Sequence, residues 1–295
     1  MQNFITTYEP EKLLSANEAN YQSYIRTYAK VKDNQFRENN KTMLTISNTD
    51  GISMINNCVA KTLMTEVDII ETLQLYKKAG KPVLWTIFPS KQPKNIEEIF
   101  KNKRLIHLER NSLMYLDMTS LDDNLKIIDD FYIKEIDDLK SLKHWTKLNA
   151  ICFSMTRDIQ RFITNSNADL FLNKKISGKH FIAYYKDKPI GTSSVFFANG
   201  VAGIYNVTTA PEARGKGIGE AITRAALISG KKAGYTFAIL QATKKGLPVY
   251  KKMGFKSNEA MDYYLKLYGR SRIIIPLNHL ILSIGNILRK LMFRI

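Results

Sequence analysis

The stretch from Gly203 to Ile222 constrains the fold of this chain more than any other segment. A strand-like run, Ala202–Thr208, leads into a glycine-rich turn that is followed by small and apolar residues with helical spacing. Three glycines alternate along the turn: Gly215, Gly217 and Gly219. Free N–H groups and the dipole at the start of a helix attract anions, and glycines let an anion come close. Because Arg214 and Lys216 add positive charge, the turn predicts a binding site for a diphosphate.

Two common phosphate-binding motifs do not fit this turn. It lacks the P-loop pattern Gly-x-x-x-x-Gly-Lys-Ser/Thr. Gly215–Gly219 has a single residue before its last glycine, which excludes the dinucleotide pattern Gly-x-Gly-x-x-Gly. Taken alone, such a run favours a helix-capping loop, so its interpretation depends on the residues around it.

Those residues resemble the GNAT (GCN5-related N-acetyltransferase) family. Arg214–Gly219 matches that family's signature Arg/Gln-x-x-Gly-x-Gly/Ala and follows a strand, as it does in the family. Downstream, Leu240–Phe255 resembles the family's next motif, in which a strand end precedes a short helix with a tyrosine and then Gly-Phe. Two motifs in this order make the resemblance specific. It covers residues 126–267 and is strongest over 203–255.

The resemblance implies an α/β (α+β) fold with a twisted, mixed, mostly antiparallel sheet flanked by helices. It also implies acetyl-CoA as co-substrate and no metal. In the family, the central strands part at a bulge and the pantetheine arm lies in the gap. On this chain, the backbone groups implied for the pantetheine are those of Val207, Thr208 and Thr209. The N–H groups implied for the pyrophosphate are those of Arg214, Gly215, Lys216, Gly217, Ile218 and Gly219.

The resemblance also implies that Tyr250 acts as general acid and gives a proton to the thiolate that leaves the tetrahedral intermediate. The alternative for Tyr250 is a ring packed under the sheet. The general base is open, because no Asp or Glu lies in residues 200–209. Asn206 and Gln241 are candidates to hold a water. Glu212 and Asp262 are candidates to contribute a charge.

The length of 295 residues predicts two domains at about 150 residues each. An acidic stretch, Asp122–Asp138, favours a boundary at residues 120–124. Before it, residues 11–31 have helical spacing, and Gly80–Ile96 is similar to a segment of bacterial acetyltransferases built from two related domains. We therefore expect a degenerate GNAT-like domain at 1–120, with a plain scaffold as the alternative, and the GNAT acetyltransferase domain at 124–268.

Residues 269–295 form a separate basic and apolar segment. Leu277, Leu280, Ile284, Leu288 and other apolar residues fall on one helical face, and five Arg or Lys residues accompany them without an acidic one. The apolar stretch 273–288 is shorter than the ~20 residues that span a bilayer. We expect an amphipathic helix at an anionic membrane surface. Docking on the first domain or on a second subunit is the alternative.

Charge and composition narrow the choice of partners. The net charge is +17, from 44 Lys and Arg against 27 Asp and Glu, but the basic residues are dispersed and no nucleic acid partner is expected. Two cysteines and four scattered histidines give neither a disulfide framework nor metal-ligand spacing. The N-terminal residues lack the pattern of a secretory signal, so we expect a cytoplasmic protein, with residues 270–295 as a peripheral membrane contact.

These features predict an acetyl-CoA-dependent N-acetyltransferase that transfers the acetyl group directly to an amine. The acceptor is an amine-bearing small molecule or protein. The alternative function is a non-catalytic acyl-CoA-binding or membrane-associated module that has lost its base.

Overall fold

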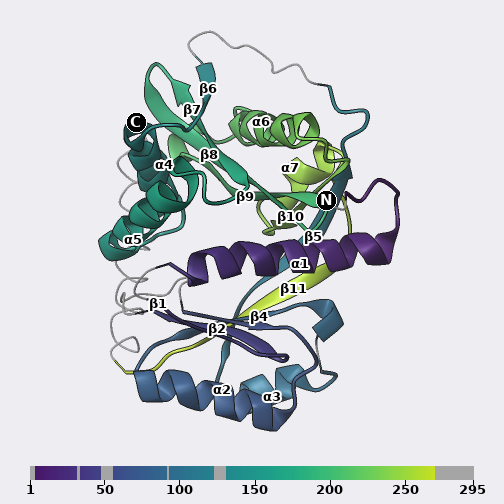
Figure 1. Cartoon of the computed structure of the whole chain (residues 1–295), viewed down its shortest axis with the longest axis vertical. Helices are drawn as coiled ribbons and strands as arrows, with labels where there is room; N and C mark the ends of the chain where they lie inside the picture. The colour runs from purple at the N-terminus through teal and green to yellow at the C-terminus, as the bar shows by residue number, and fades with distance from the viewer. Residues whose placement is uncertain (1–3, 32–33, 48–55, 92, 123–130, 270–295) are drawn as a thin grey trace. The chain divides into compact units, whose positions relative to one another are not determined.

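The computed structural model describes residues 4–31, 34–47, 56–91, 93–122 and 131–269, and the segment 270–295 with its expected membrane helix lies outside them. The described residues form a mixed α/β fold with a twisted, mostly antiparallel sheet flanked by helices, which confirms the predicted fold class (Figure 1). The chain divides into two compact units. Unit 1 contains the residues up to Val31 and Glu109–Asp262, and unit 2 contains the residues between these segments and those after Asp262.

The units differ from the two consecutive domains expected at 1–120 and 124–268. Helix α1 (Pro10–Ala29) and most of strand β5 (Ile106–Asp117) belong to unit 1, although both come from the first half of the chain. The end of strand β11 (Lys256–Lys266) belongs to unit 2. Local spacing predicts the helix at residues 11–31 correctly, but it does not say on which sheet the helix packs.

In the sheet of unit 1, six strands lie in the order β5-β10-β9-β8-β7-β6, and the first part of β11 lies beside β5. Its other strands are β6 (Phe131–Glu135), β7 (Gly178–Tyr185), β8 (Lys188–Ala198), β9 (Val201–Thr209) and β10 (Phe237–Ala242). Its other helices are α4 (Leu139–Cys152), α5 (Arg157–Asn167), α6 (Ile218–Lys232) and α7 (Leu247–Lys252), with short turns η2 (Ala168–Leu172) and η3 (Pro211–Ala213). Neighbouring strands are antiparallel except β9 and β10, which run parallel because α6 crosses over between them.

Helices cover both faces of this sheet (Figure 1). Leu240 of β10 packs in a core shared with α6 and α7, whereas its neighbour Ile239 packs with α1. Alternate residues of a strand point to opposite faces, so α6 and α7 lie on one face and α1 on the other. Helix α5 joins α1 through the hydroxyl of Tyr28, which donates to Asn167 Oδ1 at 2.6 Å.

Two buried asparagines attach α1 to the strands of unit 1. Asn17 donates from Nδ2 to the Met114 carbonyl at 3.2 Å. Asn20 donates to the carbonyls of Ala198 at 2.8 Å and Val201 at 3.3 Å. Buried amides that satisfy backbone carbonyls in this way are costly to remove, because the carbonyls would then be left unpaired. Helix α1 is therefore a structural part of unit 1.

Gly203 provides the space that Asn20 occupies. A Cβ at position 203 would lie 2.2 Å from Asn20 Oδ1 and 2.6 Å from the ring of Tyr205. We expect Gly203→Ala to lower the free energy of unfolding by about 1–3 kcal/mol, because overpacking displaces buried neighbours. Urea denaturation measures this, with Gly219→Ala as the control, since its new Cβ would meet only Thr209 Oγ1 at 3.4 Å. Equal destabilisation by both changes would show that close packing at Gly203 is not the cause.

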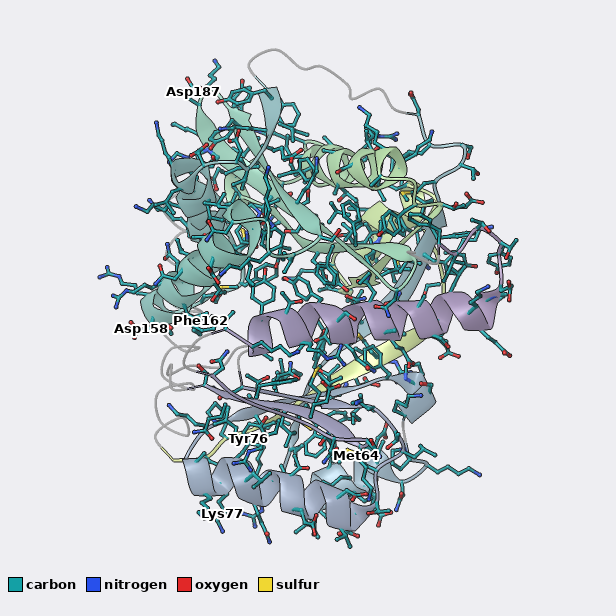
Figure 2. The ribbon with its side chains drawn as sticks, in the orientation of Figure 1. Met64, Tyr76, Lys77, Asp158, Phe162 and Asp187 are labelled. Atoms are coloured by element: carbon teal, nitrogen blue, oxygen red, sulfur yellow. The ribbon has the colours of Figure 1, made fainter. Side chains whose placement is uncertain are left out.

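Within its described residues, unit 2 combines a small sheet with two α-helices and one short 3₁₀ helix. Its strands are β1 (Asn34–Glu38), β2 (Thr42–Ser47), β3 (Asn57–Ala60) and β4 (Val83–Ile87), and its helices are α2 (Glu66–Ala79), η1 (Pro89–Lys91) and α3 (Ile96–Asn102). A capping box of Thr65 and Asp68 begins α2, and Gly80 ends it at a φ of 65°. Tyr76 points from α2 towards the strands and donates to the Asn57 carbonyl at 2.6 Å (Figure 2). Whether unit 2 is a degenerate GNAT-like domain stays a prediction.

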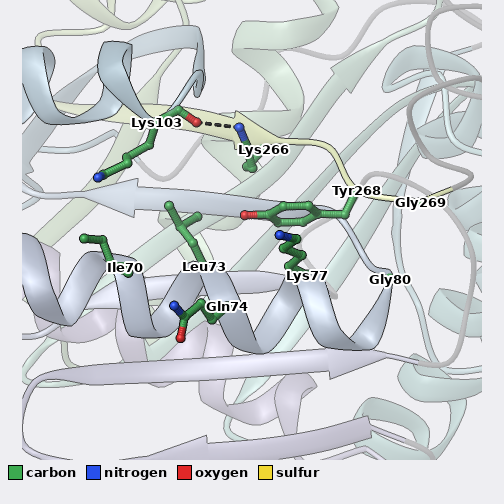
Figure 3. Close-up of a pocket in the computed structure, with 9 residues that line it drawn as sticks. All are labelled: Ile70, Leu73, Gln74, Lys77, Gly80, Lys103, Lys266, Tyr268 and Gly269. Atoms are coloured by element: carbon green, nitrogen blue, oxygen red, sulfur yellow. Dashed lines mark hydrogen bonds between the residues drawn. The ribbon is translucent and has the colours of Figure 1, made fainter.

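A shallow pocket of about 470 Å³ lies beside α2 in unit 2 (Figure 3). Lys77, Lys103 and Lys266 are among its lining residues. Two of these lysines have partners: Lys103 Nζ lies 3.0 Å from Glu66 Oε1, and Lys266 Nζ donates to the Lys103 carbonyl. No predicted site residue is among those that line this pocket. In the part of the chain that the structure describes, no helix has the length and apolarity needed to cross a membrane.

Candidate functional site

The parallel strands β9 and β10 part soon after they meet. Their paired residues are Ala202 with Ala238 and Gly203 with Ile239. Both strands continue beyond these pairs, β9 to Thr209 and β10 to Ala242, without further mutual pairing among the described residues. The backbone edge of β9 that faces β10 is therefore open over its second half. The residues predicted to bond the pantetheine occupy this half: Val207, Thr208 and Thr209.

A bulge at Asn206 coincides with the opening. On the other side of β9, Thr192 of β8 lies opposite Thr208, but Ser194 lies opposite Tyr205, so β9 has one extra residue between these pairs. Asn206 has a φ of 53°, a left-handed conformation that asparagine tolerates better than most residues. The bulge turns two consecutive side chains towards α1, since Tyr205 bonds to Asn20 and Asn206 bonds to Tyr24.

The glycine-rich turn forms the start of α6, as the sequence predicts. Gly215 and Gly217 have φ values of 79° and 77°, and a Cβ on either would meet no atom within 4 Å. They are needed for the backbone conformation rather than for space. The first N–H that bonds within the helix is that of Ala221, to the Gly217 carbonyl at 3.0 Å. The earlier N–H groups of the first turn have no acceptor within the helix and carry the positive end of its dipole.

This turn meets the open end of β9. A Cβ on Gly219 would lie 3.4 Å from Thr209 Oγ1, so the first turn of α6 is close to the last residue of the strand. Arg214 is exposed and donates from Nε to the Thr209 carbonyl at 3.4 Å, and Lys216 is exposed beside it. An open strand edge therefore leads directly to a positively charged helix terminus, which suits a ligand with an extended polar arm and an anionic end.

Tyr250 lies in α7 with its ring in the core shared with α6. Its ring packs edge-to-face on Phe255 and occupies the space above Gly246, where a Cβ would lie 2.9 Å from the ring. Burial raises the pKa of the Tyr250 hydroxyl well above its usual range, and a hydrogen bond with Thr223 of α6 offsets part of this rise. Thr223 itself donates to the Gly219 carbonyl at 2.7 Å. The phenol is therefore protonated at neutral pH and lies near the first turns of α6.

The other predicted side chains are divided between the faces of the sheet. Gln241 lies on the α1 face and donates from Nε2 to Asn17 Oδ1 at 2.7 Å. Asn206 is on the same face, whereas Tyr250 is on the face of α6 and α7. The opening between β9 and β10 thus has two amides on one side and a phenol on the other.

The two candidate charges have different surroundings. Glu212 is exposed in the turn before α6. Asp262 is buried on β11 and lies 3.4 Å from Arg110 Nη1. Within the described ranges, no group of three His, Cys, Asp or Glu side chains is placed to hold a metal ion.

The structure adds Cys152 to the neighbourhood of the site. This half-buried thiol at the end of α4 donates to the Thr209 carbonyl at 3.6 Å. Burial raises its pKa, an effect that Arg214 partly offsets. No local pattern marks Cys152, because it reaches Thr209 only through the packing of α4 on β9.

Residues 177–257 match the family model of the acetyltransferase (GNAT) domain. The chain carries a GNAT domain. The matched segment begins just before β7, contains the bulge, the glycine-rich turn and Tyr250, and ends at the start of β11. It covers both sequence motifs of the predicted family.

Solved structures share the fold of this chain. A GCN5-related N-acetyltransferase from Kribbella flavida has a TM-score of 0.64 at 12% identity and covers 85% of this chain and 96% of its own. A conserved protein of unknown function from Staphylococcus epidermidis has a TM-score of 0.62 at 13% identity, covering 81% and 99%. A tandem GNAT protein from the clavulanic acid biosynthesis pathway has a TM-score of 0.56 at 11% identity, covering 87% and 94%. No curated protein sequence matches the chain. At such identities the likeness shows the fold alone.

Proposed function

We propose that this chain is an acetyl-CoA-dependent N-acetyltransferase that passes the acetyl group directly to an amine. The observation that carries this proposal is the opening between β9 and β10 beside the start of α6. Acetyl-CoA has the matching chemistry, since an extended polar pantetheine arm is joined to a diphosphate. The GNAT domain match over the same residues supports this choice of co-substrate.

The pantetheine arm would bond to the open edge of β9 through backbone groups of Val207, Thr208 and Thr209. The pyrophosphate would accept hydrogen bonds from the N–H groups of residues 214–219 at the start of α6. Arg214 and Lys216 are exposed there and contribute full charges to the partial charge of the helix dipole. The two ends of the ligand would therefore be held by backbone groups that the fold fixes in advance.

The reaction would proceed by attack of a neutral amine on the thioester carbonyl. A C–N bond forms and gives a tetrahedral intermediate, and the C–S bond then breaks. Tyr250 donates its phenolic proton to the leaving sulfur and regains one from solvent. The proton lost by the nitrogen passes through a water held between Asn206 and Gln241 to solvent. The raised pKa of Tyr250 supports its role, because only the protonated phenol is a donor.

The acceptor would be an amine-bearing small molecule or a protein amine. The membrane contact through residues 270–295 is also a proposal, and these residues lie outside the described part of the chain. If removal of residues 270–295 leaves co-sedimentation with anionic liposomes unchanged, this contact is wrong. A cytoplasmic location with peripheral attachment would follow from such a contact.

A second candidate function is a non-catalytic acyl-CoA-binding module. It is favoured by the absence of Asp and Glu from residues 200–209 and by the ion pair that Asp262 makes with Arg110. Release of free CoA thiol, followed with acetyl-CoA and a panel of polyamines, aminoglycosides and lysine peptides, separates the two functions. The proposal predicts release that requires an amine. Saturable binding of acetyl-CoA with no release for any amine would favour the binding module instead.

A further inference from the structure

A closed ring of hydrogen-bonded side chains lies behind the bulge on the α1 face of unit 1. Its six members are Tyr24 and Tyr28 of α1, Asn167 of α5, His180 of β7, Ser194 of β8 and Asn206 of β9. Asn167, His180 and Ser194 are each no more than 2% exposed. The proposed reaction uses only Asn206, so the other five polar groups, most of them buried, need an explanation.

The donor and acceptor of each hydrogen bond follow in turn, beginning with Asn167. Its Nδ2 donates to the Ile163 carbonyl at 2.9 Å, which identifies Oδ1 as its acceptor atom. This oxygen accepts from the hydroxyl of Tyr28 at 2.6 Å and therefore also from Nε2 of His180 at 3.0 Å. Burial lowers the pKa of His180 to about 3, so the ring is neutral and carries its single proton on Nε2.

The Nδ1 atom of His180 must then accept a hydrogen bond. Its partner is Ser194 Oγ at 2.7 Å, so the Ser194 hydroxyl donates its only proton to His180. The hydroxyl of Tyr24 is committed in the same way. It hydrogen-bonds with Tyr28, whose own proton goes to Asn167, and so Tyr24 donates to Tyr28. Neither Ser194 nor Tyr24 has a proton left for Asn206.

Asn206 must therefore donate to both neighbours. Its Nδ2 lies 2.9 Å from the Tyr24 hydroxyl and 3.2 Å from Ser194 Oγ, and these two bonds use both of its protons. Because Ser194 holds Nδ2 on the side of β8, we expect Oδ1 to lie on the side of β10, where the two strands have parted. No side chain among the described residues donates to this oxygen.

We propose that the ring fixes the Asn206 amide so that its Oδ1 accepts a hydrogen bond from the attacking amine, with His180 and Ser194 as positioning residues. This role rests on the proposed acetyl transfer. An acceptor oxygen at the opening would orient the amine nitrogen and would distinguish an N–H nucleophile from other groups. A free amide could turn either its NH₂ group or its oxygen to the opening, and the ring prevents this.

The test compares Ser194→Ala with Ser193→Ala. Both serines are buried on β8, but Ser193 points to the other face and donates to the Ile222 carbonyl at 2.8 Å. We expect Ser194→Ala to lower kcat/KM for the amine about tenfold and to change KM for acetyl-CoA less than twofold. Ser193→Ala is expected to change kcat/KM for the amine less than twofold. The proposal would be overturned if both variants lowered kcat/KM for the amine equally. It would also be overturned if Ser194→Ala impaired the kinetics with the amine and with acetyl-CoA equally, because Ser194 would then be a structural residue.

A second measurement tests the direction of the hydrogen bonds in the ring and requires no turnover. Nitrogen-15 NMR of the full chain, with the His180 signals assigned by a His180→Gln variant, is expected to show a neutral ring with the proton on Nε2 from pH 5 to pH 8. A proton on Nδ1 would reverse the hydrogen bonds and overturn the proposal. A wild-type chain that transfers acetyl to no amine would refute the proposed function, and the role of Asn206 with it. A ring intact by NMR with equal effects of both serine variants in an active chain would refute only the role of Asn206.

Discussion

Tyr250→Phe is expected to lower kcat by about 100-fold, because general acid catalysis by a positioned side chain contributes roughly 10²–10⁴. Without the phenolic proton, the sulfur must leave as a bare thiolate. The ring stays in its place above Gly246 and against Phe255, so acetyl-CoA affinity is expected to change less than twofold. Stopped-flow measurement of thiol release gives kcat, and calorimetric titration gives the affinity.

Tyr235→Phe is the matched control for this change. Tyr235 is also buried in unit 1, and its hydroxyl has no hydrogen-bond partner within the described chain. We expect Tyr235→Phe to keep kcat within twofold. Because burial raises the pKa of Tyr250, its phenol stays protonated up to pH 10, and any alkaline fall in rate below that pH should persist in Tyr250→Phe. Undiminished turnover in Tyr250→Phe would remove Tyr250 from the mechanism.

Gly217→Asp is expected to weaken acetyl-CoA binding at least 30-fold. At position 217 a Cβ would meet open space, and although the φ of 77° strains any side chain, Asp and Asn tolerate it better than most residues. The added carboxylate would lie at the start of α6, beside the predicted diphosphate. Each pair of like charges ~5 Å apart costs roughly 1–3 kcal/mol at effective dielectric constants between 80 and 20. Calorimetric titration with acetyl-CoA measures the change.

Gly217→Asn provides the control for shape. Asparagine has nearly the same size as aspartate and tolerates the same backbone conformation, but it carries no charge. We expect it to weaken acetyl-CoA binding no more than fivefold. If aspartate and asparagine had the same effect, repulsion of a diphosphate would not be the cause, and the anion site would have to lie elsewhere.

Local sequence predicts the elements of the site well. The strand expected at residues 202–208 is β9, and the helix and turn after it are found at the expected positions. The reason is that turn and helix start depend on backbone preferences within a few residues. Gly215 and Gly217 adopt the positive φ values that favour glycine, and the helix follows at once.

Long-range packing could not be predicted from the same residues. Helix α1 has a clear amphipathic pattern, but nothing in residues 11–31 says that Asn17 and Asn20 bond to carbonyls nearly a hundred or more residues away. The bulge at Asn206 depends on a register shift against β8, which requires both strands. His180 was a scattered histidine in the sequence, and only the fold brings it to Asn167 and Ser194.

The most direct test of the account is the structure of the full chain with a non-hydrolysable acetyl-CoA analogue bound. The pantetheine arm is expected to lie between β9 and β10 along residues 207–209. The diphosphate is expected to lie at the N–H groups of residues 214–219, and the sulfur is expected to face Tyr250. An analogue bound outside this opening, for example in the lysine-lined pocket of unit 2, would contradict the account.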